Sequence, residues 1–200
     1  MLVNVGFADS ISFHHDNFEF SDGSRPPHNV SVIERVDAYS KIGRLVYLER
    51  DPRDVMVSLY HQVTGRLSDV FDYSGTLSEF IRDPYFGATN LANFRKIWGE
   101  LCQQPNVLKI TYEECHQDPA KTLIRILGFY GFDYSNSDIA SAVEASSLES
   151  MREIENSGKF HEPWLRRRND APKVREGRVG SFKQALDQQD LVYLNGIFRL

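Results

Sequence analysis

The segment from residue 45 to residue 60, Leu-Val-Tyr-Leu-Glu-Arg-Asp-Pro-Arg-Asp-Val-Met-Val-Ser-Leu-Tyr, decides the fold. Its first four residues form a short, continuously apolar run, which is typical of a buried parallel strand. Asp51 can cap a helix, and Pro52 suits a first helical position. Apolar residues then recur on one helical face, at Val55, Leu59 and Val63. The segment therefore predicts a strand, a tight turn and a helix.

The same order recurs further along the chain. Residues 107–110 form a second short apolar run, and Asp118-Pro119 begins another helix, which Gly131 ends. An earlier strand is predicted at Ser10–Phe13. Further helices are predicted at 30–39, after the Thr76–Glu79 capping box, and at 91–101, 137–146, 148–155 and 187–198. Alternating strands and helices predict an α/β fold, in which helices cover both faces of a parallel sheet.

Composition indicates one soluble domain spanning residues 1–200. The formal net charge of −5 lacks the basic signature of a nucleic-acid-binding protein. No apolar run approaches the ~20 residues of a membrane span, and the first nine residues do not resemble a signal peptide. Cys102 and Cys115 have neither zinc-site nor disulfide-framework spacing, so we expect a cytoplasmic protein.

Arg50 stands directly after the first apolar run and directly before the predicted helix start. A planar guanidinium at such a position suits a phosphate, since the free N–H groups of a helix start also attract anions. Ser58, eight residues further on, can add a hydroxyl to the same anion. The alternative is structural: Arg50 pairs with Asp51 or Asp54, and Ser58 faces a neighbouring element.

Three segments, in order, resemble the sulfotransferases that use 3′-phosphoadenosine 5′-phosphosulfate (PAPS). They are residues 47–61, residues 110–114 with the Asp118-Pro119 start that follows, and residues 175–183. The resemblance implies a P-loop-NTPase-like sulfotransferase fold and PAPS or its product adenosine 3′,5′-bisphosphate (PAP) as cofactor. It places Tyr112 by the adenine and four residues at the 3′-phosphate, namely Arg50, Ser58, Arg175 and Gly177. Glu176 replaces the family's usual lysine, which predicts weaker phosphate binding.

The family transfers a sulfuryl group to a hydroxyl or amine, and a histidine removes the acceptor's proton. The matching position here follows the Ser10–Phe13 strand, so His15 is the first candidate for the base and His14 the second. Two alternatives are that one of the pair is merely exposed, or that both join Asp16 in a metal site. No further spaced ligand supports a metal, so none is expected.

The family's opening strand and Pro-Lys-Ser-Gly-Thr loop, which hold the 5′-phosphosulfate, have no counterpart in the chain. The expectation is therefore an N-terminally truncated sulfotransferase fold, whose unpaired sheet edge favours a homo-oligomer. The rival interpretation is a catalytically inactive nucleotide-binding or interaction protein, or a fragment. A small-molecule kinase would need phosphate-loop and magnesium residues that are not visible.

The acceptor is expected to be a small molecule, a lipid or a carbohydrate. Its pocket is predicted in three loops, at 18–28, 61–73 and 159–169. Their aromatic side chains suit either an apolar or sugar-binding cleft or ordinary packing: Phe18, Phe20, Phe71, Tyr73, Phe160 and Trp164.

Overall fold

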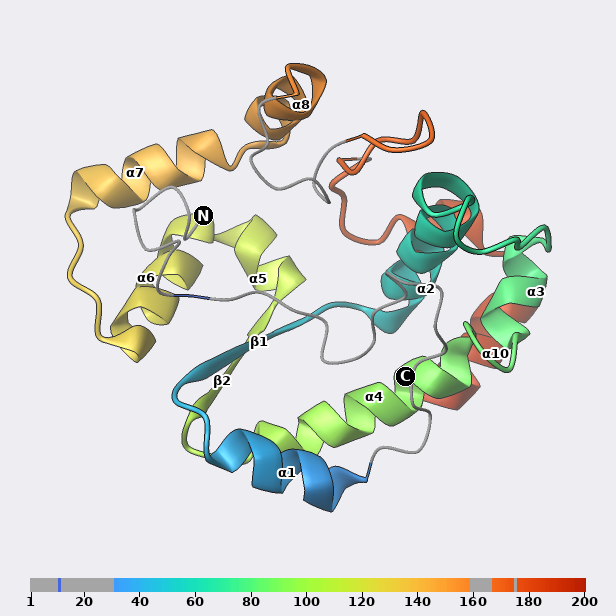
Figure 1. Cartoon of the computed structure of the whole chain (residues 1–200), viewed down its shortest axis with the longest axis horizontal. Coiled ribbons are helices and arrows are strands. Elements are labelled where there is room, and N and C mark those ends of the chain that lie inside the picture. The colour runs from blue at the N-terminus through green and yellow to red at the C-terminus, as the bar shows by residue number, and fades with distance from the viewer. Residues whose placement is uncertain (1–10, 12–30, 159–166, 175) are drawn as a thin grey trace.

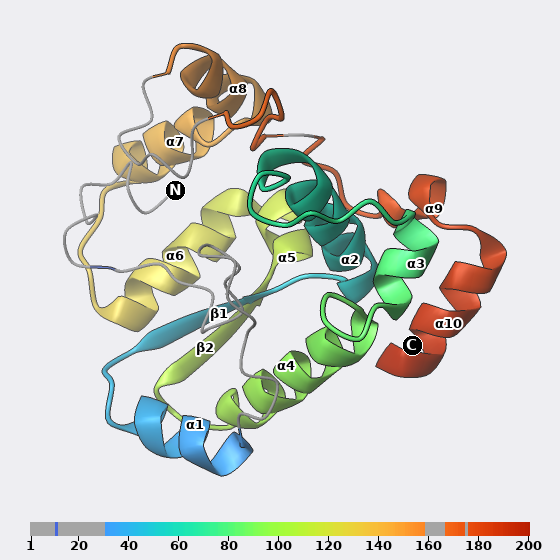
Figure 2. The same cartoon turned by 45° about the vertical axis from the view of Figure 1, so that its right-hand side comes forward.

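The computed structural model describes residues 11, 31–158, 167–174 and 176–200. At the centre of this part of the chain, β1 (Leu45–Glu49) and β2 (Val107–Thr111) pair in parallel, from Leu45 opposite Val107 to Glu49 opposite Thr111. Figures 1 and 2 show α1 (Val32–Ser40) and α4 (Ala88–Leu101) on one side of the strands, with α6 (Pro119–Tyr130) on the other. The strands predicted from residue 45 and from residue 107 are confirmed. The strand predicted at Ser10–Phe13 falls, apart from Ile11, outside the described residues.

The side chains of β1 are half-buried, apart from that of Leu48, which is exposed. Tyr47 points to α4 and stacks on Trp98, with ring centroids 4.8 Å apart. Leu48 points the opposite way, because successive side chains of a strand alternate between faces, and it is 53% exposed. The prediction of a continuously buried run is therefore wrong, because residues 45–47 are half-buried and Leu48 is exposed, although the parallel pairing that it implied is correct.

The turn from β1 into α2 (Pro52–His61) follows the sequence signals closely. The Asp51 side chain accepts a hydrogen bond from the Arg53 backbone N–H, and Pro52 occupies the first helical position. The helix runs on into a π-helical turn, η3 (Gln62–Arg66). Of the predicted apolar face, Val63 is fully buried, whereas Val55 and Leu59 pack against the core from its margin.

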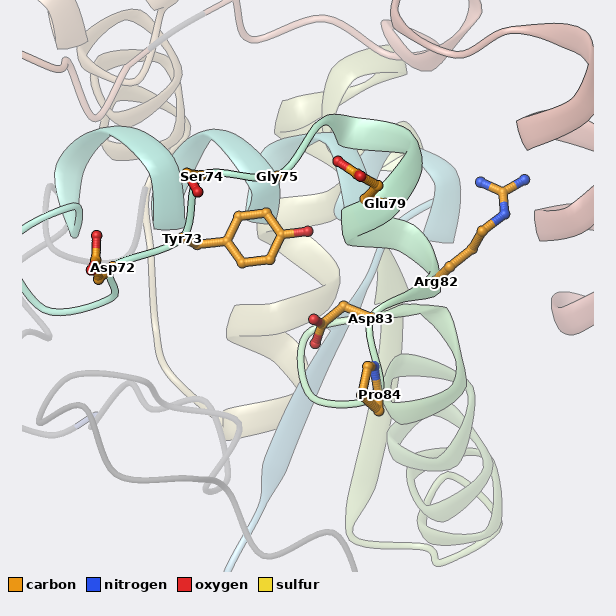
Figure 3. Close-up of a pocket in the computed structure, with 8 residues that line it drawn as sticks. All are labelled: Asp72, Tyr73, Ser74, Gly75, Glu79, Arg82, Asp83 and Pro84. Atoms are coloured by element: carbon orange, nitrogen blue, oxygen red, sulfur yellow. The ribbon is translucent and has the colours of Figure 1, made fainter.

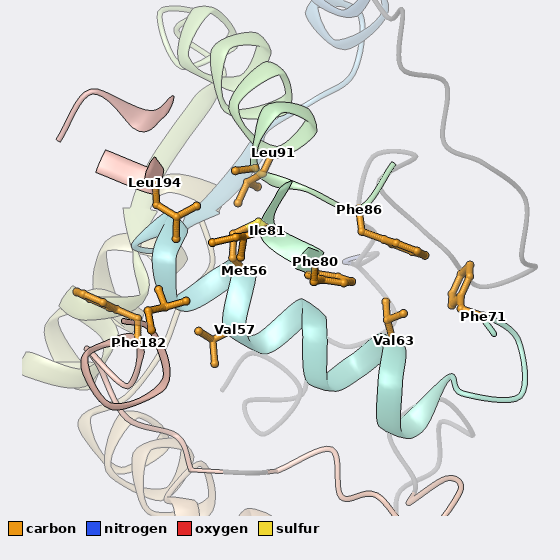
Figure 4. Packing of buried hydrophobic residues seen from close by; sticks show 12 residues of the cluster. Met56, Val57, Val63, Phe71, Phe80, Ile81, Phe86, Leu91, Phe182 and Leu194 are labelled. Atoms are coloured by element: carbon orange, nitrogen blue, oxygen red, sulfur yellow. The ribbon is translucent and has the colours of Figure 1, made fainter. Parts of the chain in front are cut away.

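The main hydrophobic core lies where α2 and η3 meet α3 (Leu77–Arg82), α4 and α10 (Gln188–Phe198). Figure 4 shows Phe80 of α3 in the middle of this cluster, beside Met56 of α2 and Val63 of η3. The short α9 (Phe182–Ala185) closes one side of the cluster through Phe182. The core thereby joins residues 55–94 to the C-terminal residues 182–198.

Of the remaining helices, α5 (Tyr112–Gln117) and α6 pack beside the second strand, α7 (Asn136–Ala145) packs on α6, and α8 (Leu148–Asn156) packs on α7. Asp118 caps α6, and Gly131 ends it in the left-handed conformation, with φ of +78°. Each predicted helix that lies within the described residues is present. In the part of the chain that the structure describes, no helix combines the length and the apolar character that a membrane crossing requires.

Candidate anion-binding site

Arg50 lies at the carboxyl end of β1, where its guanidinium is held from three directions. Its Nη2 donates to the backbone oxygen of Arg178 at 3.0 Å and lies 3.3 Å from Oδ2 of Asp54. The guanidinium carbon is 4.3 Å from the centre of the Tyr112 ring. Its Nε is buried without a hydrogen-bond partner among the described residues. A buried donor of this kind is unfavourable unless an acceptor reaches it, so Arg50 keeps one donor that the described contacts leave unused.

The backbone on both sides of the Arg50 side chain is also fixed. Arg95 of α4 donates through Nη1 to the Arg50 carbonyl oxygen at 3.0 Å and pairs through Nη2 with Glu49 at 3.1 Å. The next backbone N–H, of Asp51, donates to Oε1 of Glu113 at 3.1 Å. The guanidinium therefore projects from a main chain that α4 and α5 hold in place.

Asp51 is engaged by Arg53 and not by Arg50. Arg53 Nη2 lies 2.6 Å from Asp51 Oδ2, and its guanidinium also stacks over Phe182 and reaches Asn195. Burial pushes the pKa of Asp51 upward, but hydrogen bonds from Arg53 outweigh it and hold that pKa below its ordinary value. Of the two structural pairings considered for Arg50, the one with Asp54 is present.

Asp54 brings the C-terminal loop, defined here as residues 176–182, to the start of α2. Its side chain is fully buried. Oδ2 accepts from the Gly180 N–H at 2.7 Å, and Oδ1 accepts from the Ser181 hydroxyl at 3.0 Å and the Phe182 N–H at 2.9 Å. The sequence analysis missed this role, since it considered Asp54 only as a partner for Arg50. No sequence signal links residue 54 to residues 180–182.

The other predicted phosphate contacts are only partly described. Ser58 lies on an exposed face of α2, two turns beyond Arg50. Gly177 has φ of +60°, a conformation that strains other residues, and a β-carbon there would come within 2.8 Å of the Leu148 side chain of α8, which would have to move. Three predicted site residues lie outside the described part of the chain: Arg175, His14 and His15.

Tyr112 contacts Arg50 directly. The residue opens α5 after the Thr111 capping box, which places its ring against the guanidinium. Burial raises the pKa of the Tyr112 phenol, and the nearby Arg50 charge lowers it by less. The ring thus stays neutral at physiological pH and offers its face to a cation.

Glu176 meets a positive partner within the C-terminal loop. Its carboxylate accepts from Nη2 of Arg178 at 3.0 Å, and both side chains are exposed. The backbone oxygen of that same Arg178 is the one that Arg50 binds. The guanidinium of Arg178 is therefore paired with Glu176, and only the backbone of Arg178 contacts Arg50.

An open hollow lies on another part of the surface, between the segment after η3 and the end of α3 (Figure 3). Tyr73 lies along it, whereas Phe71 is buried in the core and serves packing. Glu79 closes the capping box of α3, and Asp83 accepts from the N–H groups of Tyr85 and Phe86. These carboxylates are thus used by the fold itself.

Comparisons with known proteins show the family of the chain. A family model described as the sulfotransferase domain matches residues 29–199. The chain belongs to the sulfotransferase family. Human sulfotransferase 2B1 is 34% identical over 119 residues, which cover 57% of this chain and 32% of that protein. Rat sulfotransferase 1C2 is 26% identical over 144 residues, or 70% of this chain and 48% of its own length.

A solved family structure shows the same fold. Mouse sulfotransferase SULT7A1 complexed with PAP superposes with a TM-score of 0.65 at 22% identity, over 82% of this chain and 59% of that one. The sulfotransferase fold predicted from the sequence is confirmed. The chain spans between about a third and a half of the length of the two curated relatives described above.

Proposed function

We propose that this chain binds PAPS and PAP at Arg50 and takes part in transferring a sulfuryl group to a hydroxyl or amine acceptor. The observation that supports it best is the buried Arg50 Nε, which has no partner among the described residues and lies where β1 gives way to the capped start of α2. A 3′-phosphate supplies oxygen atoms that can accept hydrogen bonds from the Arg50 guanidinium. The structural relatives crystallised with PAP support the choice of nucleotide.

Each remaining residue has a proposed part in this function. Arg50 holds the 3′-phosphate, with help from Ser58, Arg175 and Gly177, and Tyr112 borders the adenine while it steadies Arg50. His15, or His14 in its place, takes the proton from the acceptor as the acceptor oxygen or nitrogen bonds to sulfur. The bond from sulfur to the 5′-phosphate oxygen breaks, and PAP leaves.

Calorimetric titration with PAP tests the nucleotide site. We expect saturable binding by the wild-type chain and a loss of about 100-fold in affinity for Arg50→Ala, because a buried charge-assisted contact to phosphate is removed. Arg44→Ala is the matched control: this exposed arginine at the opposite end of β1 binds the Phe129 carbonyl, and its loss should leave affinity unchanged.

A folded wild-type chain that does not bind PAP would contradict the proposal, and so would an Arg50→Ala variant that binds PAP as tightly as wild type. Transfer needs a separate assay, in which radioactive sulfate moves from labelled PAPS to a panel of phenols, sterols, amines and sugars. Binding without transfer to any acceptor would favour a nucleotide-binding protein that does no chemistry.

Replacing Glu176 with lysine should tighten PAP binding by about 3- to 10-fold at low salt. The change removes a negative charge from the C-terminal loop and frees Arg178 from its local pair. The gain should shrink at 1 M salt, where exposed charges are screened beyond about 3 Å. Glu100→Lys, on the exposed face of α4, makes the same charge change elsewhere and should have little effect. Equal affinities for wild type and Glu176→Lys would refute the prediction.

A further inference from the structure

Asp54 is a charge that the fold has removed from water entirely. Its carboxylate is fully buried and receives four contacts, of which three come from residues 180–182 and one from Arg50. Burying a carboxylate is unfavourable unless hydrogen bonds and a counter-charge replace its hydration. Residues 180–182 therefore supply most of what keeps Asp54 buried, and Asp54 in turn fixes where those residues lie.

Arg50 depends on the same loop. Its Nη2 is shared between the Arg178 backbone oxygen and Asp54 Oδ2, so the loop and the carboxylate together restrict how the guanidinium can turn. The Tyr112 ring closes a third side. Arg50, Asp54 and residues 178–182 thus form one closed circuit of contacts: Arg50 to Arg178, the loop to Asp54, and Asp54 back to Arg50.

We propose that Asp54 is the positioning residue that couples the C-terminal loop to the Arg50 site. This inference rests on the proposed function, because it assigns the loop a part in binding PAP. An anion at Arg50 favours the arrangement in which Arg50, Asp54 and the loop are all engaged. Since coupling between two sites is reciprocal, PAP tightens the loop, and a tightened loop raises the affinity for PAP. Asp54 itself does not touch the ligand; it acts through Arg50 and the loop.

Amide hydrogen exchange, followed by NMR with and without PAP, tests this coupling. In the wild-type chain, PAP should slow exchange at the Gly180 and Phe182 amides by at least about 10-fold. Asp54→Asn keeps the shape of the side chain but loses its charge and turns an amide donor toward its former donors. This variant should bind PAP at least about 10-fold more weakly, and PAP should no longer slow exchange in the loop.

Asp190→Asn is the matched control, because Asp190 is also a buried aspartate. It accepts from Ser78 and Arg82 and ties α10 to α3, away from the loop. Its loss should destabilise the fold while leaving PAP affinity and the loop's response to PAP intact. A merely structural role for Asp54 would make the two variants behave alike. If Asp54→Asn does not fold, Ser181→Ala removes one loop donor and should show a smaller effect of the same kind.

The outcomes separate the two proposals. Equal PAP affinity and equal loop protection in wild type and Asp54→Asn would overturn the coupling and leave the nucleotide site standing. A wild-type chain that does not bind PAP would overturn the proposed function. In that case, amide hydrogen exchange without ligand still tests whether Asp54 holds the loop in place. Unchanged exchange rates at Gly180 and Phe182 in Asp54→Asn would overturn that role of Asp54 too.

Discussion

Replacing Phe80 with alanine should lower the free energy of unfolding by about 3–5 kcal/mol, the usual range for truncating a large buried aromatic side chain. Phe80 is fully buried at the centre of the main core. Its ring meets three others, those of Tyr60, Tyr73 and Phe86, with centroids between 5.2 and 5.4 Å away. The surrounding helices can collapse only partly into the space that the ring leaves.

Urea denaturation monitored by circular dichroism measures this loss. Phe80→Leu keeps most of the buried volume and should lose about 1 kcal/mol. Val192→Ala on α10, where the side chain is 63% exposed, should change stability by less than about 0.5 kcal/mol. A loss below about 1 kcal/mol for Phe80→Ala would show that the aromatic cluster is not the main support of this core.

Replacing Gly87 with alanine should destabilise the chain by about 3 kcal/mol, at the upper end of the range for forcing extra volume into a packed site. A β-carbon at Gly87 would lie 2.2 Å from the Asp83 carbonyl oxygen and 2.9 Å from both the Asp83 nitrogen and the Ile81 carbonyl oxygen. All three are backbone atoms, so no side chain can turn aside. The start of α4 would have to move away from the end of α3.

Gly99 provides the matched control in the same helix. A β-carbon there meets no atom within 4 Å, and alanine favours a helix over glycine. Gly99→Ala should therefore raise stability by up to about 1 kcal/mol. Thermal unfolding of the two variants side by side gives the comparison, and a neutral Gly87→Ala would contradict the predicted clash.

The sequence predicted the elements well where local chemistry determines them. Asp51-Pro52 and Asp118-Pro119 act through neighbouring backbone groups, and both begin helices as expected. The π-helical turn at Gln62–Arg66 carried no such signal, because one extra residue in a turn leaves the apolar pattern almost unchanged. The exposure of Leu48 was missed for a different reason: an apolar run shows that a strand can be buried, but not how much of each face is covered.

In the candidate site, too, the residues that local patterns indicate could be predicted, whereas contacts between distant segments could not. Arg50 could be predicted because an arginine between an apolar run and a helix cap is a local pattern, and because the surrounding segment resembles a known family. The contact of Tyr112 with Arg50 depends on how two strands align, which the sequence does not state. The bonds from Asp54 to residues 180–182 bridge more than 120 positions, and only the folded chain brings those residues together.

That separation has a consequence for the order of events during synthesis. Arg50 and Asp54 emerge from the ribosome more than 120 residues before the loop that contacts them, which is complete only after residue 182 has been made. Until then the Asp54 carboxylate of α2 lacks the loop N–H groups that donate to it in the folded chain. Closing so long a stretch of chain is entropically unfavourable and comes late in folding. The proposed nucleotide site is thus completed only after residue 182 has been made, and a nascent chain that stops short of the loop lacks it.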